Sequence, residues 1–410
     1  MTPCDLTIIV PTYREAANLP VLVPRITAAV HHVGLDAEIL IVDDNSPDDT
    51  PDLCRRLAAE FPVRLEVRQS ERGLSSAVIH GMRQARGAVL LVMDADLSHP
   101  PEKIAEPVAS LNDPAIDFVI GSRYVPGAAT DESWGLFRKL NSRVATWLAR
   151  PLTRVADPMA GFFALRKTTF ASAAPLDPIG YKIGLELIVK GRCRQVREIP
   201  IRFADRLHGT SKLTLREQVN YVRHLKRLYE FQFGGWFHLL LFLAVGLAGM
   251  GVDLASYAVL LAWLPLAAAR GAAIWTAMTF NFWLNRRFTF SAARREPALR
   301  QYAAFCLSCL CGAGVNWGLS VGLCRLNSAF DGHRLAAAML GAVGGAGFNF
   351  LLSRSFVFRA RTRVGAAAQP QCGVSSPASA ELATLPASLG QEPANQVSEA
   401  PVRESEPVVS

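Results

Sequence analysis

The second half of this chain contains four apolar blocks, and these blocks constrain its fold more than any other feature. Between Trp236 and Val357 the hydrophobic residues fall into stretches of roughly 20 residues, the length at which a helix crosses the hydrocarbon core of a bilayer. Before about residue 230 the apolar runs are only as long as strands. With 410 residues the chain has room for two or three domains. The sequence therefore predicts a soluble domain followed by a membrane domain.

The membrane half is predicted to cross the bilayer four times, near residues 236–260, 264–284, 302–324 and 335–353. Arginines gather in the loop between the second and third spans and in the chain after the fourth. Since cytoplasmic loops are rich in Lys and Arg, we expect the soluble domain and both termini to face the cytoplasm, in a multi-pass protein of a bacterial inner membrane. The same clusters account for the net charge of +8, so no nucleic-acid partner is expected.

The membrane half is also internally repeated. The segment FNFWLNRRFTF at 280–290 returns 68 residues later as FNFLLSRSFVF at 348–358, and GMGVD at 249–253 is echoed by GAGVN at 312–316. This repeat predicts a duplicated two-helix hairpin whose copies share one orientation, because each copy crosses the membrane twice. Asp253 is a carboxylate within a predicted span. A functional role, a pairing with a neighbouring helix and a position at the interface all stay open for it.

Four regions are predicted along the chain. Residues 1–213 form the soluble domain, 214–233 an amphipathic helix on the membrane surface, 234–360 the membrane domain and 361–410 a tail. The amphipathic helix is predicted because apolar residues at helical spacing alternate with arginines. These apolar residues are Leu215, Val219, Val222, Leu225 and Leu228. The tail is rich in Ala, Pro, Ser and Glu with almost no aromatic residues, which predicts disorder.

Strand-like runs alternate with helical stretches over the first 125 residues, and this order predicts an α/β fold with a mostly parallel sheet. Ligands of open parallel sheets bind at the carboxyl ends of the strands. Four predicted strands end in polar segments there: TYRE at 12–15, DDNS at 43–46, DAD at 94–96 and SRY at 122–124. One such segment alone can be a turn or a helix cap, since Asp, Asn and Ser favour both. Four segments at one edge indicate a binding site.

The paired carboxylates of Asp94 and Asp96 indicate the chemistry of this site. Two carboxylates about 4 Å apart at an effective dielectric of about 20 repel each other by about 4 kcal/mol, so they must share a proton or a cation. A shared proton suits proteases and glycoside hydrolases, but no strand-end partner resembles the second acid that a hydrolase needs at sugar-width separation. Mg²⁺ takes one or two carboxylates together with substrate phosphates. Asp43 could then hold a nucleoside, and the loop with Arg206 and Lys212 could close over a diphosphate.

Six motifs across the soluble half carry a family resemblance. They are IVPTYRE at 9–15, IVDDNSPDDT at 41–50, GLSSAVIHGM at 73–82, MDADLSHPPE at 93–102, GSRY at 121–124 and DRLHGTSK at 205–212. Through them, residues 6 to about 230 resemble the family-2 glycosyltransferases, and within these the dolichol (polyprenol) phosphate mannose synthases. The NFxLxRxFxF repeats make the membrane half similar to the GtrA-like four-span family. The resemblance implies a Rossmann-like GT-A fold and an inverting transfer from a nucleotide sugar.

The resemblance also implies roles for individual residues. Asp94 and Asp96 would bind nucleotide and a Mg²⁺ or Mn²⁺ ion, and Arg206 and Lys212 would hold the diphosphate. The nucleotide-binding set would also include Pro11, Tyr13, Glu15, Ile41, Asp43 and Ala95, while Arg123 and Arg138 would bind a phosphate of donor or acceptor. Many relatives carry Gln at the position of Ser98, so Ser98 is expected to be a weaker metal ligand. Asp94, Asp96, Arg123, Arg206 and Lys212 form the expected catalytic set.

The leading hypothesis is a transfer of mannose from GDP-mannose to a membrane polyprenyl phosphate on the cytoplasmic leaflet. A phosphate acceptor is already an anionic nucleophile near neutral pH, so such a reaction requires no strong general base. The first alternative is the same reaction with UDP-glucose or another UDP-sugar. The second is a lipid-sugar translocator or membrane scaffold without catalysis. The membrane repeats could assist catalysis, hold the acceptor or promote flipping.

Overall fold

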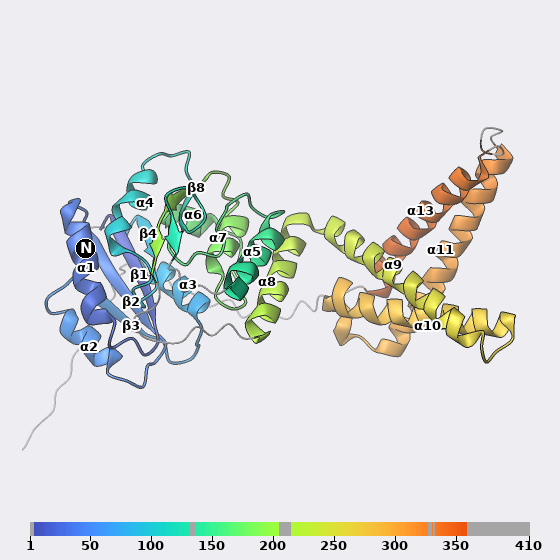
Figure 1. Cartoon of the computed structure of the whole chain (residues 1–410), viewed down its shortest axis with the longest axis horizontal. Coiled ribbons are helices and arrows are strands. Elements are labelled where there is room, and N and C mark those ends of the chain that lie inside the picture. The colour runs from blue at the N-terminus through green and yellow to red at the C-terminus, as the bar shows by residue number, and fades with distance from the viewer. Residues whose placement is uncertain (1–3, 131–135, 205–214, 327–329, 331–332, 359–410) are drawn as a thin grey trace, which may run out of the picture. The chain divides into compact units, whose positions relative to one another are not determined.

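The computed structural model describes residues 4–130, 136–204, 215–326, 330 and 333–358 (Figure 1). The predicted loop with Arg206 and Lys212 and the predicted tail lie outside these residues. Arg138 belongs to a described helix, but its side chain also lies outside the described part.

Seven strands of the soluble half form one sheet in the order β3-β2-β1-β4-β7-β5-β8. Their bounds are β1 (Leu6–Thr12), β2 (Ala37–Asp43), β3 (Val63–Val67), β4 (Val89–Val92), β5 (Phe118–Ser122), β7 (Phe163–Arg166) and β8 (Val196–Pro200). Only β7 runs antiparallel to its neighbours, β4 and β5. The short strands β6 (Ala129–Thr130) and β9 (Arg202–Phe203) pair separately. The predicted mostly parallel α/β sheet is thus confirmed.

The central strands are buried on both faces, which explains why their sequences are continuously apolar rather than alternating. All seven residues of β1 are buried. Ile8 packs on the face covered by α1 (Leu19–His32), α2 (Thr50–Leu57) and α4 (Ala105–Ser110). The next residue, Ile9, packs on the opposite face, beneath α3 (Leu74–Gln84) and α7 (Ile183–Lys190). A Cβ at Gly81 would lie 2.6 Å from the Ile9 side chain, so α3 can approach β1 this closely only with glycine there.

The strand order reverses beside β1. From β1 the chain proceeds outward to β2 and β3 and then returns to the other side of β1 to form β4. Crevices at such reversals, outside the carboxyl ends of the strands, are where open α/β sheets bind their ligands. The fold therefore places the ends of β1, β2 and β4 at the expected site.

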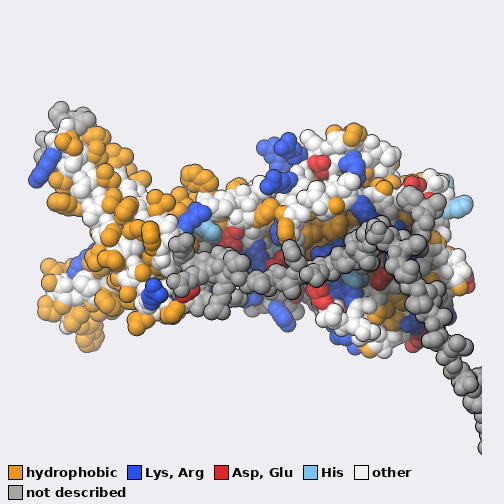
Figure 2. Space-filling view, turned by 180° about the vertical axis from the view of Figure 1, so that it is seen from behind, with side chains coloured by type: hydrophobic (Ala, Val, Ile, Leu, Met, Phe, Trp, Pro, Cys, Tyr) orange, Lys and Arg blue, Asp and Glu red, His pale blue; other side chains and the backbone are white. Residues whose placement is uncertain are grey.

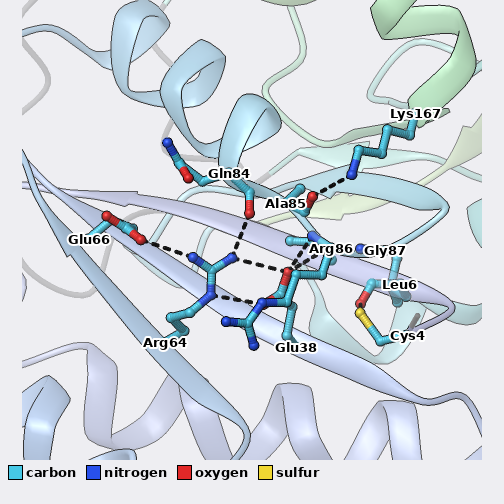
Figure 3. A network of polar contacts seen from close by, with 11 residues as sticks. Cys4, Leu6, Glu38, Arg64, Glu66, Gln84, Ala85, Arg86, Gly87 and Lys167 are labelled. Atoms are coloured by element: carbon cyan, nitrogen blue, oxygen red, sulfur yellow. Dashed lines mark hydrogen bonds and ion pairs between the residues drawn. The ribbon is translucent and has the colours of Figure 1, made fainter. Parts of the chain in front are cut away.

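A buried carboxylate fastens the other end of the sheet (Figure 3). Glu38, near the start of β2, accepts hydrogen bonds from Thr7 Oγ1 at 2.7 Å, the Arg86 backbone N–H at 2.7 Å and Arg64 Nε at 3.0 Å. Burial alone would raise the pKa of Glu38, but the hydrogen bonds from Arg64, Arg86 and Thr7 lower the pKa below its ordinary value. This network is structural, because it lies at the amino-terminal end of β2, away from the predicted site.

We expect Glu38→Ala to lower the free energy of unfolding of the soluble domain by about 3 kcal/mol at pH 7, since it removes one partner of a largely buried ion pair. The folded-state pKa lies below the unfolded value, so this contribution is full at pH 7 and is lost as the pH falls through the folded-state pKa. Urea unfolding at pH 7 and at about pH 4 measures both effects. Exposed Glu60→Ala is the control. An equal deficit at both pH values would contradict the role of the Glu38 charge.

The helix α8 (Leu215–Phe233) has the predicted apolar spacing, and part of that face packs on the soluble domain. Leu225 and Leu228 are buried together with residues of α5 (Leu136–Ala149) and α7. The Tyr221 and Tyr229 hydroxyls each donate to an α5 carbonyl at 2.7 Å. Val222 remains exposed. The placement of α8 on a membrane surface stays a prediction for its exposed face.

Four long helices follow: α9 (Gly235–Leu260), α10 (Leu266–Leu284), α11 (Ala298–Leu326) and α13 (Arg334–Leu352). They coincide closely with the four predicted spans, and α9 and α11 are long and apolar enough to cross a membrane. α9 packs along α10, and α11 packs along α13. Many hydrophobic side chains lie on the surface of this part (Figure 2), including Leu247 and Leu310. Such an outward-facing apolar surface suits contact with lipid.

The predicted duplication is visible in an aromatic core shared by the two hairpins. Its members form repeat-related pairs: Phe242 and Phe305, Phe282 and Phe350, and Phe290 and Phe358. The last pair stacks with ring centroids 4.8 Å apart. Equivalent contacts occur twice, since Phe242 meets Phe350 at 5.5 Å and Phe305 meets Phe282 at 5.8 Å. A π-helical turn follows each hairpin, at Asn285–Thr289 and Ser353–Val357. The two hairpins are therefore copies in three dimensions as well as in sequence.

Asp253 pairs with a neighbouring helix, which was one of the interpretations left open. Its Oδ2 accepts a hydrogen bond from Arg270 of α10 at 2.8 Å. The second hairpin has Asn316 at the equivalent position, and Asn316 Oδ1 accepts from Ser320 at 3.2 Å. The ion pair therefore distinguishes the first hairpin from its copy.

Candidate active site

Three strand ends at the expected site hold strained backbone. The described residues include four non-glycine residues with positive φ, and three of these follow β1, β2 and β4. They are Arg14 at 63°, Asn45 at 54° and Leu97 at 62°. Residues in the left-handed region cost roughly 1–3 kcal/mol each and concentrate where function requires a particular backbone shape. Their distribution supports a functional site at these three strand ends.

Asp94 and Asp96 follow β4 and differ in accessibility. Asp96 is buried, and its Oδ1 accepts hydrogen bonds from the Ser98 backbone N–H at 3.1 Å and the Ser98 hydroxyl at 2.6 Å. Asp94 is more exposed. Ser98 therefore orients the Asp96 carboxylate in this structure, whereas its predicted part as a metal ligand stays a prediction.

The donor set around Asp94 fits a divalent cation that is completed by substrate. Among the described residues, no three His, Cys, Asp or Glu side chains gather in a metal-binding arrangement. A pair of carboxylates suits Mg²⁺, which takes one or two carboxylates and keeps waters and substrate phosphates in its shell. Asp94 and Asp96 are the residues that would hold such an ion.

His99 holds the backbone of Asp94 in place through a hydrogen bond, a role that the sequence did not reveal. The Asp94 backbone N–H donates to His99 Nδ1 at 3.1 Å, so the neutral ring carries its proton on Nε2. The ring is buried between Phe162 and Phe203, with centroid distances of 5.6 Å and 5.5 Å. Burial lowers the pKa of His99 despite the nearby Asp94 and Asp96 charges. His99 is therefore a positioning residue for Asp94.

We expect His99→Leu to lower kcat of sugar transfer roughly 10- to 100-fold, because it leaves the Asp94 N–H without an acceptor and lets the carboxylate shift. His99→Asn is the matched variant, since its amide oxygen can accept in place of Nδ1. Steady-state rates for both variants, with thermal unfolding as a folding control, check the expectation. Equal losses in the two variants would show that ring packing, rather than the hydrogen bond, matters.

Arg123 follows β5 and is locked to a buried carboxylate. Its Nε and Nη2 donate to Asp157 at 2.7 Å and 2.8 Å, and its backbone N–H donates to the same side chain at 3.0 Å. The guanidinium also faces the Phe203 ring at 5.3 Å. Burial opposes the Arg123 charge, but the hydrogen bonds and charge of Asp157 raise its pKa overall. Arg123 is thus a permanently charged, rigid cation beside Asp94, as a phosphate-binding residue requires.

Lys182 is a second cation at this site, and no sequence motif indicated a role for it. It immediately precedes α7, and its Nζ donates to the Met159 carbonyl at 3.4 Å. Burial and the charge of Arg123 lower the pKa of Lys182 to about 7, although Asp157, Asp94 and Glu217 oppose the change. No local sequence pattern could identify it, since it lies almost 90 residues after Asp94 in a segment that reads as an ordinary helix start.

The predicted nucleoside side is assembled at the ends of β1 and β2. Tyr13 is exposed, and the guanidinium groups of Arg14 and Arg72 lie 5.3 Å and 5.5 Å from the centre of its ring. Glu15 accepts a hydrogen bond from Asn18 at 2.6 Å. Pro11 and Ile41 are buried within β1 and β2, and Ala95 is buried just after β4. An exposed aromatic ring beside cations offers a stacking surface for a base.

Asp43, the last residue of β2, and Asp44, which follows it, have different roles. Asp43 is fully buried and accepts hydrogen bonds from the Ser46 backbone N–H at 2.8 Å and the Ser46 hydroxyl at 2.6 Å, so it shapes the turn in the manner of a cap. Asp44, which sequence reasoning left without a role, pairs with Arg68 at 2.8 Å and accepts from the Gly73 N–H at 2.7 Å. The binding of a nucleoside by Asp43 stays a prediction.

A pocket of about 440 Å³ opens beside Tyr124, the residue that follows Arg123 in the sequence. It is lined by Tyr124, Arg143, Thr146, Trp147, Arg150 and Ala156. The Tyr124 hydroxyl hydrogen-bonds the Ser142 hydroxyl at 2.6 Å, which ties the strand end to α5. Two arginines beside two aromatic rings form a surface that suits a phosphate with an apolar chain attached.

Comparisons with known proteins agree with the two-part organisation. Residues 7–169 match the family model "Glycosyl transferase family 2", and residues 241–358 match "GtrA/DPMS, transmembrane domain". A dolichol-phosphate mannosyltransferase of Pyrococcus furiosus is 37% identical over 359 residues, which cover 85% of this chain and 98% of the relative. The enzyme of the same name from Saccharomyces cerevisiae is 40% identical over 239 residues, covering 56% of this chain and 89% of the relative.

The chain is also similar to solved structures. Glucosyl-3-phosphoglycerate synthase from Mycobacterium tuberculosis aligns with a TM-score of 0.42 and 17% sequence identity, over 56% of this chain and 80% of that chain.

Proposed function

Because this chain belongs to the dolichol-phosphate mannosyltransferases, glycosyltransferases of family 2, we propose that it transfers mannose from GDP-mannose to the phosphate of a membrane polyprenyl phosphate. It is a glycosyltransferase that carries a GtrA/DPMS transmembrane domain and is a membrane protein. The proposal adds the identity of the donor, the lipid acceptor and the cytoplasmic leaflet as the side of reaction.

The observation that carries the proposal is the carboxyl edge of the sheet, where Asp94 and Asp96 lie beside the Arg123–Asp157 pair. The nucleoside would bind along Tyr13, Glu15 and Asp43, which places its diphosphate over the end of β4. A Mg²⁺ or Mn²⁺ ion held by Asp94 and Asp96 would supply positive charge to the leaving diphosphate. Arg206 and Lys212 belong to the proposed set as cations that cover the diphosphate.

The acceptor would occupy the pocket lined by Tyr124, the residue that follows Arg123. Its phosphate oxygen is already ionised near neutral pH, so the protein need only hold it in line with the bond to the leaving diphosphate. Arg123, Arg138 and the pocket arginines Arg143 and Arg150 would bind the phosphate, and Trp147 would contact the first part of the lipid chain. Attack from the face opposite the leaving group inverts the anomeric configuration.

The charge and composition of the chain support one orientation in the membrane. The arginine-rich segments at 286–300 and 354–363 would lie at the cytoplasmic surface, with the soluble domain of 1–213 on the same side. The exposed face of α8, within 214–233, would lie at the interface, and residues 234–360 would cross the membrane four times. A catalytic domain tethered in this way can reach a nucleophile that cannot leave the bilayer.

Purified full-length enzyme with radiolabelled GDP-mannose, polyprenyl phosphate vesicles and Mg²⁺ or Mn²⁺ should form a lipid product that releases mannose in mild acid. EDTA should stop the reaction, and either metal should restore it. Transfer that persists in EDTA would remove the metal from the proposal. Protease accessibility of the soluble domain in inside-out and right-side-out vesicles tests the cytoplasmic orientation, with cleavage expected only in the former.

A further inference from the structure

Lys182 is a cation at the site that none of the roles above uses. It follows a turn at Gly180, where φ is 80°, and it is partly buried. Among the described residues, no carboxylate lies within ion-pair distance of its ammonium group. Lys190 and Lys226, by contrast, each have a carboxylate partner, at 2.6 Å and 2.9 Å. The Lys182 side chain is therefore short of hydrogen-bond acceptors.

The contacts that Lys182 does make are weak. An ammonium group has three donors. One points to the Met159 carbonyl at 3.4 Å, which is long compared with the 2.7–2.9 Å of a charge-assisted hydrogen bond, and the Tyr181 ring centre lies 4.2 Å away. Keeping a partly buried ammonium group charged with only one long hydrogen bond costs free energy unless an anion binds to it. An anionic ligand would supply the missing acceptors.

The surroundings of Lys182 identify where that ligand would lie. The groups that act on its charge are Arg123 after β5, Asp157 in the loop before β7, Asp94 after β4 and Glu217 on α8. Asp157 is already committed to Arg123. The Met159 segment also borders Asp94, because a Cβ at Gly161 would lie 3.1 Å from Asp94 Oδ2. Lys182 thus lies near both Asp94, on the proposed donor side, and Arg123, on the proposed acceptor side.

We propose that Lys182 binds a phosphate oxyanion of the substrates directly, at the junction of the donor and acceptor sites. This inference rests on the proposed function and adds a catalytic residue to it. Two sources offer the same chemistry: the diphosphate of the nucleotide sugar and the phosphate of the lipid acceptor. An ammonium beside the reacting phosphates would stabilise the negative charge that moves from acceptor to leaving group.

The helix α8 holds the turn that carries Lys182. The Ile179 N–H donates to His224 Nδ1 at 3.3 Å, and Asp177 pairs with Arg227 at 2.6 Å. A Cβ at Gly180 would lie 3.3 Å from Glu217 Oε2. Since α8 continues into α9 after Gly234, the position of Lys182 depends on the helix that leads to the membrane domain.

The test compares Lys182→Met and Lys182→Arg with wild type, with exposed Lys103→Met as the control. We expect Lys182→Met to lower kcat/KM for one phosphate substrate roughly 30- to 300-fold, and Lys182→Arg to recover a large part of it. Titration calorimetry with GDP and Mg²⁺, without acceptor, separates the sources. A loss of GDP affinity assigns Lys182 to the diphosphate; unchanged GDP affinity with a lower kcat/KM for polyprenyl phosphate assigns it to the acceptor.

A proton-linkage measurement excludes a merely structural role. With its pKa of about 7, Lys182 is mostly neutral at pH 8, so binding of the phosphate ligand should take up protons in wild type. Calorimetry in buffers of different ionisation enthalpy should show this uptake with GDP or with polyprenyl phosphate vesicles, and the uptake should vanish in both variants. The inference would be overturned if folded Lys182→Met kept the kinetics, the GDP affinity and the proton uptake of the wild type. Absence of mannosyl transfer by wild type, with the binding effects intact, would instead reject the proposed reaction alone.

Discussion

Asp96→Ala is expected to lower mannosyl transfer at least about 1,000-fold while the soluble domain remains folded. Asp96 is buried at the end of β4, and Ser98 fixes its carboxylate through two hydrogen bonds. A carboxylate oriented in this way can hold a cation, and among the described residues no cluster of three or more His, Cys, Asp or Glu side chains offers a second such site. Steady-state rates with GDP-mannose and polyprenyl phosphate measure the loss.

Metal-dependent binding separates this explanation from misfolding. GDP with Mn²⁺ should raise the thermal unfolding temperature of the wild type, because a ligand that binds the folded state stabilises it. The same addition should have little effect on Asp96→Ala. Exposed Asp52→Ala serves as the control and should behave as wild type. If Asp96→Ala kept more than a tenth of the activity, the assignment of Asp96 to the metal would be wrong.

Arg123→Gln is the second substitution with a large expected effect. It removes the proposed phosphate-binding cation and leaves the fully buried Asp157 carboxylate without its partner. We expect transfer to fall about 100- to 1,000-fold and the free energy of unfolding to fall by about 3–5 kcal/mol. Rates and urea unfolding at pH 7 measure the two losses separately.

The double variant Arg123→Gln with Asp157→Asn distinguishes the two contributions. It replaces the ion pair with a neutral amide pair, so no buried charge is left uncompensated. We expect the double variant to regain most of the lost stability without regaining activity. Recovery of activity together with stability would show that Arg123 serves the fold alone and binds no phosphate.

The sheet and the strand ends could be predicted because their signals are local. Apolar runs such as those of β1 and β2 show period and length directly, and each polar strand end adjoins its strand in sequence. The pairing of parallel strands then brings Asp43 and Asp94 to one edge. The duplicated hairpins were equally accessible, since the repeat can be read by comparing two segments of the same chain.

The contacts of Arg123 and Lys182 could not be predicted, because they join residues far apart in the sequence. Arg123 meets Asp157 only because β7 inserts antiparallel between β4 and β5. Lys182 reaches the site through the packing of α7 beneath the sheet. The apolar pattern of α8 gave the helix correctly, but burial against α5 and membrane contact use the same pattern, so periodicity alone cannot distinguish them.

The most direct test of the central claim is a competition between donors. Full-length enzyme in vesicles with polyprenyl phosphate and Mg²⁺ would receive GDP-mannose and UDP-glucose together, and the sugar on the lipid product and its anomeric configuration would be determined by mass spectrometry and NMR. The account predicts a mannosyl phosphate lipid of inverted configuration. A glucosyl lipid, or a mannosyl lipid with retained configuration, would contradict it.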